Sequence, residues 1–196
     1  MPGLTSVLAL LAGLVAGFFH VLAGPDHLAA VAPIVADDNR VAWRAGLSWG
    51  LGHTAGVLLV AFRELLPIAA LSAWSERLVG VALITVGLWG LWRARVPHTH
   101  QHVTSTPSFA MGTLHGLAGS SHLYGVLPSL MFTSRADALA YLAGFGAGAI
   151  GAMTAFTAAL GAVASSAGRS SQSVRQAVLY AASAAAVVVG GVWLLV

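Results

Sequence analysis

The chain lacks cysteine and lysine, and only 8% of its residues are charged. The absence of cysteine excludes disulfides and metal sites built on thiolates. The nine basic residues are all arginine and form no basic stripe, so we expect no binding to nucleic acid. A soluble domain carries about 25% charged residues. With 58% hydrophobic residues, this chain is therefore expected to be an integral protein of the cell (inner) membrane, surrounded by the lipid bilayer.

Apolar runs of membrane-spanning length occur along the whole chain. A helix that crosses a bilayer needs about 20 apolar residues, and six runs meet this requirement: 8–36, 45–62, 74–92, 109–132, 138–164 and 177–196. Three fall in each half, residues 1–92 and 108–196, with a polar loop at 93–107 between them. An odd number of spans per half places the halves in opposite orientations. We therefore expect an all-α membrane protein made of two inverted three-helix repeats.

A histidine motif near the start of each half supports this repeat. Four residues recur at a constant offset of 95: His20 with His115, Gly24 with Gly119, His27 with His122, and Pro33 with Pro128. Placing an imidazole inside a membrane costs free energy, so histidines in membrane spans usually have a function. A duplicated pair, with glycine or proline between the two imidazoles, is typical of a transport site formed by a broken first helix in each repeat.

The first copy of the motif has the spacing of a broken helix. On an unbroken helix His20 and His27 would lie about 10.5 Å apart along the axis, whereas one ion holds two imidazole nitrogens at most about 4.2 Å apart. Gly24 and Pro25 resolve this conflict, because proline interrupts a helix. Asp26 then falls in the first turn of a second half-helix, where a carboxylate is favourable. We predict that His20, Asp26 and His27 bind metal; the alternatives are packing histidines and a helix-start aspartate.

Further candidate ligands lie in the second span and in the second half. His53, flanked by small residues, either binds the same metal or only hydrogen-bonds a neighbouring helix, and we predict the first role. The second half has glycine and alanine where His53 would recur, and serines where the first half has Pro25 and Asp26. Its polar groups are therefore predicted to line a path, complete the site or form a weaker second site: His115, Ser120, Ser121 and His122.

The polar loop between the halves contains three alternating histidines, His98, His100 and His102. In an extended chain alternate residues face the same way, so these imidazoles could bind one ion loosely. The alternative is a solvated loop without a ligand. All the candidate donors are imidazoles and a carboxylate without sulfur, a set that suits divalent nickel, cobalt, zinc, copper or iron.

These motifs resemble those of the nickel/cobalt transporter superfamily, in particular its short UreH-like and NicO-like six-helix membrane proteins. That superfamily has His, four residues and then Asp-His, whereas His20 is followed by five residues before Asp26 and His27. Its Gly-His-Ser motif is similar to the Gly-His-Thr around His53, and the resemblance covers nearly the whole chain. The resemblance implies a divalent metal substrate, Ni²⁺ or Co²⁺ ahead of Zn²⁺ or Fe²⁺.

Three functions of different classes fit these residues. The leading hypothesis is a transporter without enzymatic activity, which carries a divalent transition metal by alternating access at the repeat interface. The second is a metal-delivery or assembly factor for a metalloenzyme, which acts through a metalloenzyme-maturation partner. Independently of the function, the chain is expected to be able to form a homo-oligomer. The third is a membrane metalloenzyme, which is disfavoured because the sequence lacks a His-Glu-x-x-His motif.

The distribution of arginine predicts the orientation in the membrane. Six arginines lie in the first, third and fifth loops, and three lie in the other loops. Positive charge favours the cytoplasmic side. We therefore expect both termini outside and the 93–107 loop in the cytoplasm.

Overall fold

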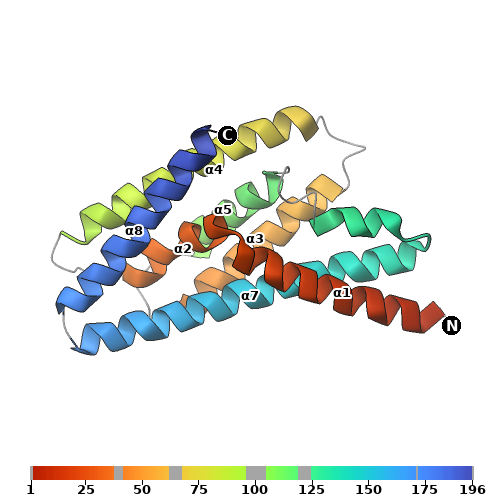
Figure 1. The fold of residues 1–196 in the computed structure, drawn as a ribbon, viewed down its shortest axis with the longest axis horizontal. Helices are drawn as coiled ribbons and strands as arrows, with labels where there is room; N and C mark the ends of the chain where they lie inside the picture. The colour runs from red at the N-terminus through yellow and green to blue at the C-terminus, as the bar shows by residue number, and fades with distance from the viewer. Residues whose placement is uncertain are drawn as a thin grey trace.

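The computed structural model describes all residues except 1, 38–41, 62–67, 96–104, 119–124, 171 and 196. The described chain is helical throughout (Figure 1). Its elements are α1 (Pro2–Ala23), α2 (Pro25–Asp37), α3 (Ala42–Ala61), α4 (Ile68–Arg93), α5 (Ser105–Leu117), the 3₁₀ helix η2 (Leu127–Met131), α7 (Arg135–Ser170) and α8 (Gln172–Leu195). The predicted all-α class is confirmed for these residues.

Four of the described helices are long and apolar enough to cross a membrane: Gly3–Ala23, Trp74–Arg93, Arg135–Ser166 and Gln172–Leu195. Large apolar side chains such as Leu8, Leu88 and Val188 are exposed along them, as expected of surfaces that face lipid. These features support an integral membrane protein. The predicted spans at 45–62 and 109–132 correspond to α3 and to the shorter α5, which ends at Leu117. The count of six spans and the inverted repeat stay predictions.

The break expected in the first span is confirmed. α1 ends at Ala23, α2 begins at Pro25, and Gly24 lies between them outside either helix. Proline suits the first position of a helix, where its missing N–H would have no intrahelical partner. The Gly24 carbonyl accepts hydrogen bonds from the backbone N–H groups of His27 (3.1 Å) and Leu28 (3.4 Å). α2 has only 13 residues, too few to cross a bilayer alone, so it forms the second part of the predicted 8–36 span, after the break.

The long helices pack in pairs. α1 lies along α7, α3 lies along α5, and α4 lies along α8 (Figure 1). Glycines permit the closest approaches: a Cβ on Gly17 of α1 would overlap the Phe145 backbone of α7, and a Cβ on Gly148 of α7 would overlap the Leu14 backbone of α1. Small residues at such contacts let membrane helices approach closely. The pairs enclose α2, which packs against α4, α7 and α8.

A buried apolar cluster holds the broken helix in place. It joins Val21 of α1, Val31 of α2, Trp49 of α3 and Met153 of α7, all of them fully buried. Val21 directly follows His20, and Trp49 lies one helical turn before His53. Packing of this cluster therefore brings the histidines of α1, α2 and α3 to one place.

Candidate metal site

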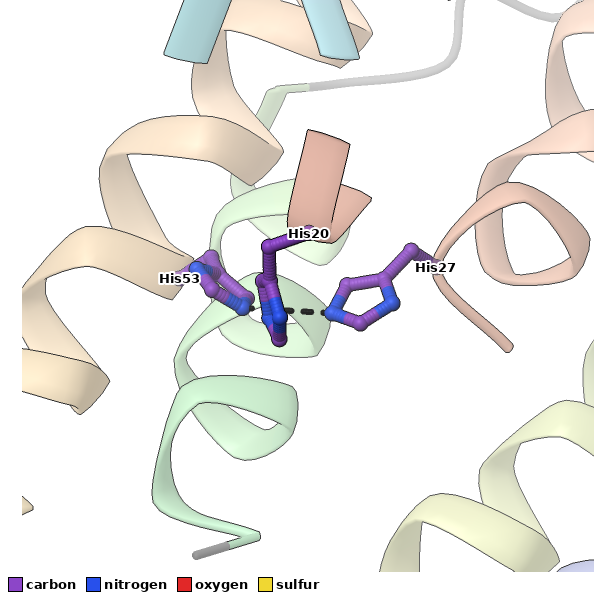
Figure 2. Close-up of side chains that lie close together, drawn as sticks. All are labelled: His20, His27 and His53. Carbon is purple, nitrogen blue, oxygen red and sulfur yellow. Dashed lines mark hydrogen bonds between the residues drawn. The ribbon is translucent and has the colours of Figure 1, made fainter. Parts of the chain in front are cut away.

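Three histidines from three helices converge beside the break. His20 comes from the last turn of α1, His27 from the first turns of α2, and His53 from α3 (Figure 2). One ligand nitrogen of each lies within 4.8 Å of the corresponding nitrogens of the other two. His27 and His53 are almost completely buried, and His20 is partly buried. We refer to this group as the three-histidine cluster.

The separation of His27 and His53 matches that of two ligands on one ion. Their Nε2 atoms are 3.3 Å apart and form a hydrogen bond. Two imidazole nitrogens bound tetrahedrally at about 2.05 Å from a metal lie about 3.3 Å apart. A cation placed between them would therefore displace the shared proton and require little movement of either ring.

His20 occupies the third side of the cluster. Its ring packs edge-on against His27, with centroids 4.9 Å apart, and lies 5.6 Å from the ring of His53. On the other side it meets Phe145 of α7 at 5.3 Å between centroids. The break at Gly24 therefore achieves what a straight helix could not, since it brings two histidines seven residues apart into ring contact.

Asp26 lies behind His27. Its Oδ1 is 3.1 Å from Nδ1 of His27, whose Nε2 faces His53. The carboxylate is buried, with 5% of Asp26 exposed. The sequence predicted Asp26 as a direct ligand; in the structure its Oδ1 lies beside Nδ1 of His27, the ring nitrogen that does not face His53. A carboxylate in this position fixes the tautomer and orientation of a metal-binding histidine.

His115 also reaches this region, from α5 in the second half. It is fully buried, its ring centroid is 5.8 Å from that of His27, and its Nε2 is 3.9 Å from Oδ2 of Asp26. Of the three roles predicted for the second-half group, this position is compatible with completion of the site and with a second site beside it. The other members, Ser120, Ser121 and His122, lie outside the described residues, as do the loop histidines His98, His100 and His102.

Trp49 is a part of the site that the sequence reasoning missed. Its fully buried ring stacks on His53, with centroids 4.9 Å apart and planes 21° apart. It also contacts His27 at 5.3 Å and His115 at 5.5 Å between centroids. Its position four residues before His53 places both side chains on one face of α3, and this spacing was the available signal. Trp49 restricts the rotation of three imidazoles at once.

Comparison with known proteins finds a relative that is named a urease accessory protein. It is 32% identical over 182 residues to the urease accessory protein UreH of Bacillus sp. (strain TB-90), and the match covers 81% of this chain and 77% of that protein. The chain belongs to the UreH family. This confirms the UreH-like part of the resemblance inferred from the motifs.

Two plant proteins are similar to this UreH family member over part of their length. The chloroplast proteins FOR GROWTH AND FERTILITY 1 and FOR GROWTH AND FERTILITY 2 of Arabidopsis thaliana are each 33% identical to it over 76% of this chain. The chain spans about half of their length, 48% and 46%. No family model matches the chain, and no solved structure matches it.

Proposed function

We propose that this UreH family member is a membrane transporter of a divalent transition metal, and that nickel or cobalt is its preferred substrate. The observation that carries the proposal is the three-histidine cluster, whose ligand nitrogens lie within 4.8 Å of one another. His20, His27 and His53 are the proposed ligands. Burying an imidazole inside a membrane bundle costs free energy, so histidines found there usually mark an ion pathway or a binding site.

The donor set favours a borderline metal. Three imidazole nitrogens without sulfur suit Ni²⁺, Co²⁺, Zn²⁺ or Fe²⁺ and disfavour copper(I). The preference for nickel or cobalt comes from the resemblance to the nickel/cobalt transporter superfamily. Asp26 supports the site through its contact with His27 Nδ1 (3.1 Å) and contributes a negative charge nearby. That charge partly offsets the positive charge of a divalent ion in a region of low dielectric.

The proposed mechanism is alternating access between two inverted repeats of three spans, residues 1–92 and 108–196, joined by the 93–107 loop. Reciprocal packing supports it. The first helix of one half, α1, packs on α7 of the other, and the first helix of the second half, α5, packs on α3 of the first. A two-fold axis in the membrane plane that relates the halves would place α1 on α5 and α7 on α3, and would therefore convert the first contact into the second. The three-histidine cluster then lies near the interface between the halves.

A second candidate function is metal delivery to a metalloenzyme. The relative from Bacillus is named an accessory protein of urease, and an accessory role could require a partner that receives the metal. We propose no enzymatic activity. The carboxylate closest to the three-histidine cluster, Asp26, is engaged with His27, whereas a hydrolytic metal site needs a general base that faces the open metal position.

The proposed function is tested by metal flux into liposomes that contain only the purified protein and a trapped metal-sensitive dye. We expect Ni²⁺ or Co²⁺ to enter faster than into protein-free liposomes, and His27→Ala to remove this flux. Gly151→Ala, where a Cβ would meet nothing within 4 Å, is the control and should transport like the parent. Metal binding without flux would favour the delivery role. Neither binding nor flux would contradict both functions.

Orientation is a separate proposal, with both termini outside and the 93–107 loop in the cytoplasm. The native chain has no cysteine, so a single cysteine introduced by Gln101→Cys can be labelled without background. We expect an impermeant thiol reagent added outside intact cells to leave it unlabelled, and to label it after the membrane is opened. Labelling from outside would reverse the proposed orientation.

A further inference from the structure

His115 and Asp26 face each other beside the three-histidine cluster, and neither residue is a member of that cluster. Nδ1 of His115 lies 3.1 Å from the Met111 carbonyl. A carbonyl only accepts hydrogen bonds, so Nδ1 carries a proton and donates it. In the neutral ring Nε2 then presents a lone pair. This Nε2 points toward Asp26, whose Oδ2 lies 3.9 Å away.

The 3.9 Å between these two atoms is too long for a hydrogen bond and lies within the range of separations found for two ligands of one ion. Hydrogen bonds between nitrogen and oxygen span about 2.7–3.2 Å. A metal bound to an imidazole nitrogen and a carboxylate oxygen holds them about 3 to 4.2 Å apart, depending on the angle. Nε2 of His115 has no hydrogen bond of good geometry to the described residues, although the backbone of Asp26 also interacts with this ring. Both groups are buried, with 0% of His115 and 5% of Asp26 exposed, so a lone pair facing a carboxylate there calls for a cation.

We propose that Asp26 and His115 form a second position for the transported metal, next to the three-histidine cluster. This inference rests on the proposed function, because it assigns a further stop on the same route. Asp26 is linked to both positions, because its Oδ1 lies beside Nδ1 of His27, a proposed ligand of the first, and its Oδ2 points toward His115. Two dications at such neighbouring positions repel each other, so the positions are filled in turn.

The second position also connects the two halves of the chain. His20, His27 and His53 belong to the first half, whereas His115 belongs to the second and matches His20 in the sequence repeat. With only two protein ligands, the second position binds metal more weakly than the three-histidine cluster. A weaker neighbouring position suits an ion in transit, because conduction requires binding that is favourable enough to enter and weak enough to leave.

Cobalt binding to purified full-length variants tests this position, with Co²⁺ absorption and equilibrium dialysis as readouts. In His53→Ala the three-histidine cluster is incomplete, and we expect weak Co²⁺ binding to remain. Adding His115→Gln, which keeps a polar side chain of similar size, should remove most of that residual binding. Adding Thr113→Ala instead, on the same helix, is the matched control and should leave the residual binding unchanged. Equal residual binding in His53→Ala and in the His53→Ala/His115→Gln double variant would overturn the second position.

A transport measurement separates this inference from the proposed function. His115→Gln alone should keep tight Co²⁺ binding within about twofold of the parent, because the three histidines are intact, while its flux into liposomes falls roughly tenfold. Parental flux in a folded His115→Gln variant would overturn the second position and leave the proposed function standing. A parent protein that neither binds nor transports Co²⁺ would overturn both.

Discussion

In the first half of the chain, position 53 is a histidine whose side chain enters the three-histidine cluster, whereas the residue 95 positions later is Gly148. Both positions lie where two helices touch. The backbone carbonyl of His53 faces Gly116 of α5, and Gly148 faces the backbone of Leu14 in α1. Where α3 meets α5, the glycine at the contact is Gly116 of α5, so position 53 of α3 can carry a side chain that reaches the three-histidine cluster. Where α7 meets α1, the glycine at the contact is position 148 itself, which therefore has no side chain that could bind a metal.

The histidine motifs of the two halves show the same division of roles. In the first half, Gly24 is followed by Pro25, Asp26 and His27, which begin α2 with a carboxylate and an imidazole in its first turn. In the second half, α5 ends at Leu117 and its last turn contributes His115. The first half therefore supplies most of the proposed ligands, and the described part of the second half supplies packing surface and one histidine, His115.

Gly24→Ala should damage the metal site severely, although glycine carries no ligand. A Cβ at position 24 would overlap Nδ1 of His27 and lie 3.0 Å from Oδ1 of Asp26. The His27 ring is packed between His20, His53 and Trp49 and has little room to move. We expect a loss of metal affinity of about 100-fold or more, since a ligand itself is displaced, measured by equilibrium dialysis. Gly3→Ala, where a Cβ meets nothing within 4 Å, is the control.

Asp26→Asn should have an intermediate effect. The amide cannot supply the negative charge beside His27 Nδ1, which lies 3.1 Å from the carboxylate. Loss of such a supporting partner typically lowers metal affinity about 10- to 100-fold. Glu at this position keeps the charge, so Asp26→Glu should recover part of the affinity in the same dialysis measurement. An Asn variant that binds metal as tightly as the parent would show that Asp26 is only a helix-start residue.

Gly148→Ala should weaken the bundle and spare the metal site. A Cβ there would overlap the Leu14 carbonyl at the contact between α1 and α7. Overpacking of this kind costs about 1–3 kcal/mol, so we expect a lower unfolding midpoint in detergent. Gly151→Ala on the same helix has open space and should unfold like the parent. Metal affinity of the folded protein should stay within about twofold in both variants; a large loss in Gly148→Ala would mean that the second half shapes the site directly.

The sequence predicted the break from local reasons, and it predicted His53 as a ligand because His20, Asp26 and His27 lie only one span away. A separation of seven residues conflicts with helix geometry, and Gly24 with Pro25 offers one way to relieve that conflict. The position of Asp26 behind His27 and the stacking of Trp49 on His53 were not predicted. Each pair lies on one helix, α2 or α3, but the side-chain rotamers are set by packing against other helices, and hydrophobic periodicity carries no information about ring orientation. The arrival of His115 beside Asp26 depends similarly on the close contact of α5 with α3.

The central claim is that His20, His27 and His53 together hold one metal ion, and calorimetric titration of purified protein with Ni²⁺ tests it most directly. The parent should bind one ion tightly and release protons, because the ion displaces the proton shared by His27 and His53. Proton release appears as a dependence of the measured heat on the buffer. His53→Ala should lose the tight site, while Thr85→Ala, an exposed hydroxyl bonded to its own helix, should bind like the parent. Parental Ni²⁺ affinity and proton release in His53→Ala would contradict the account.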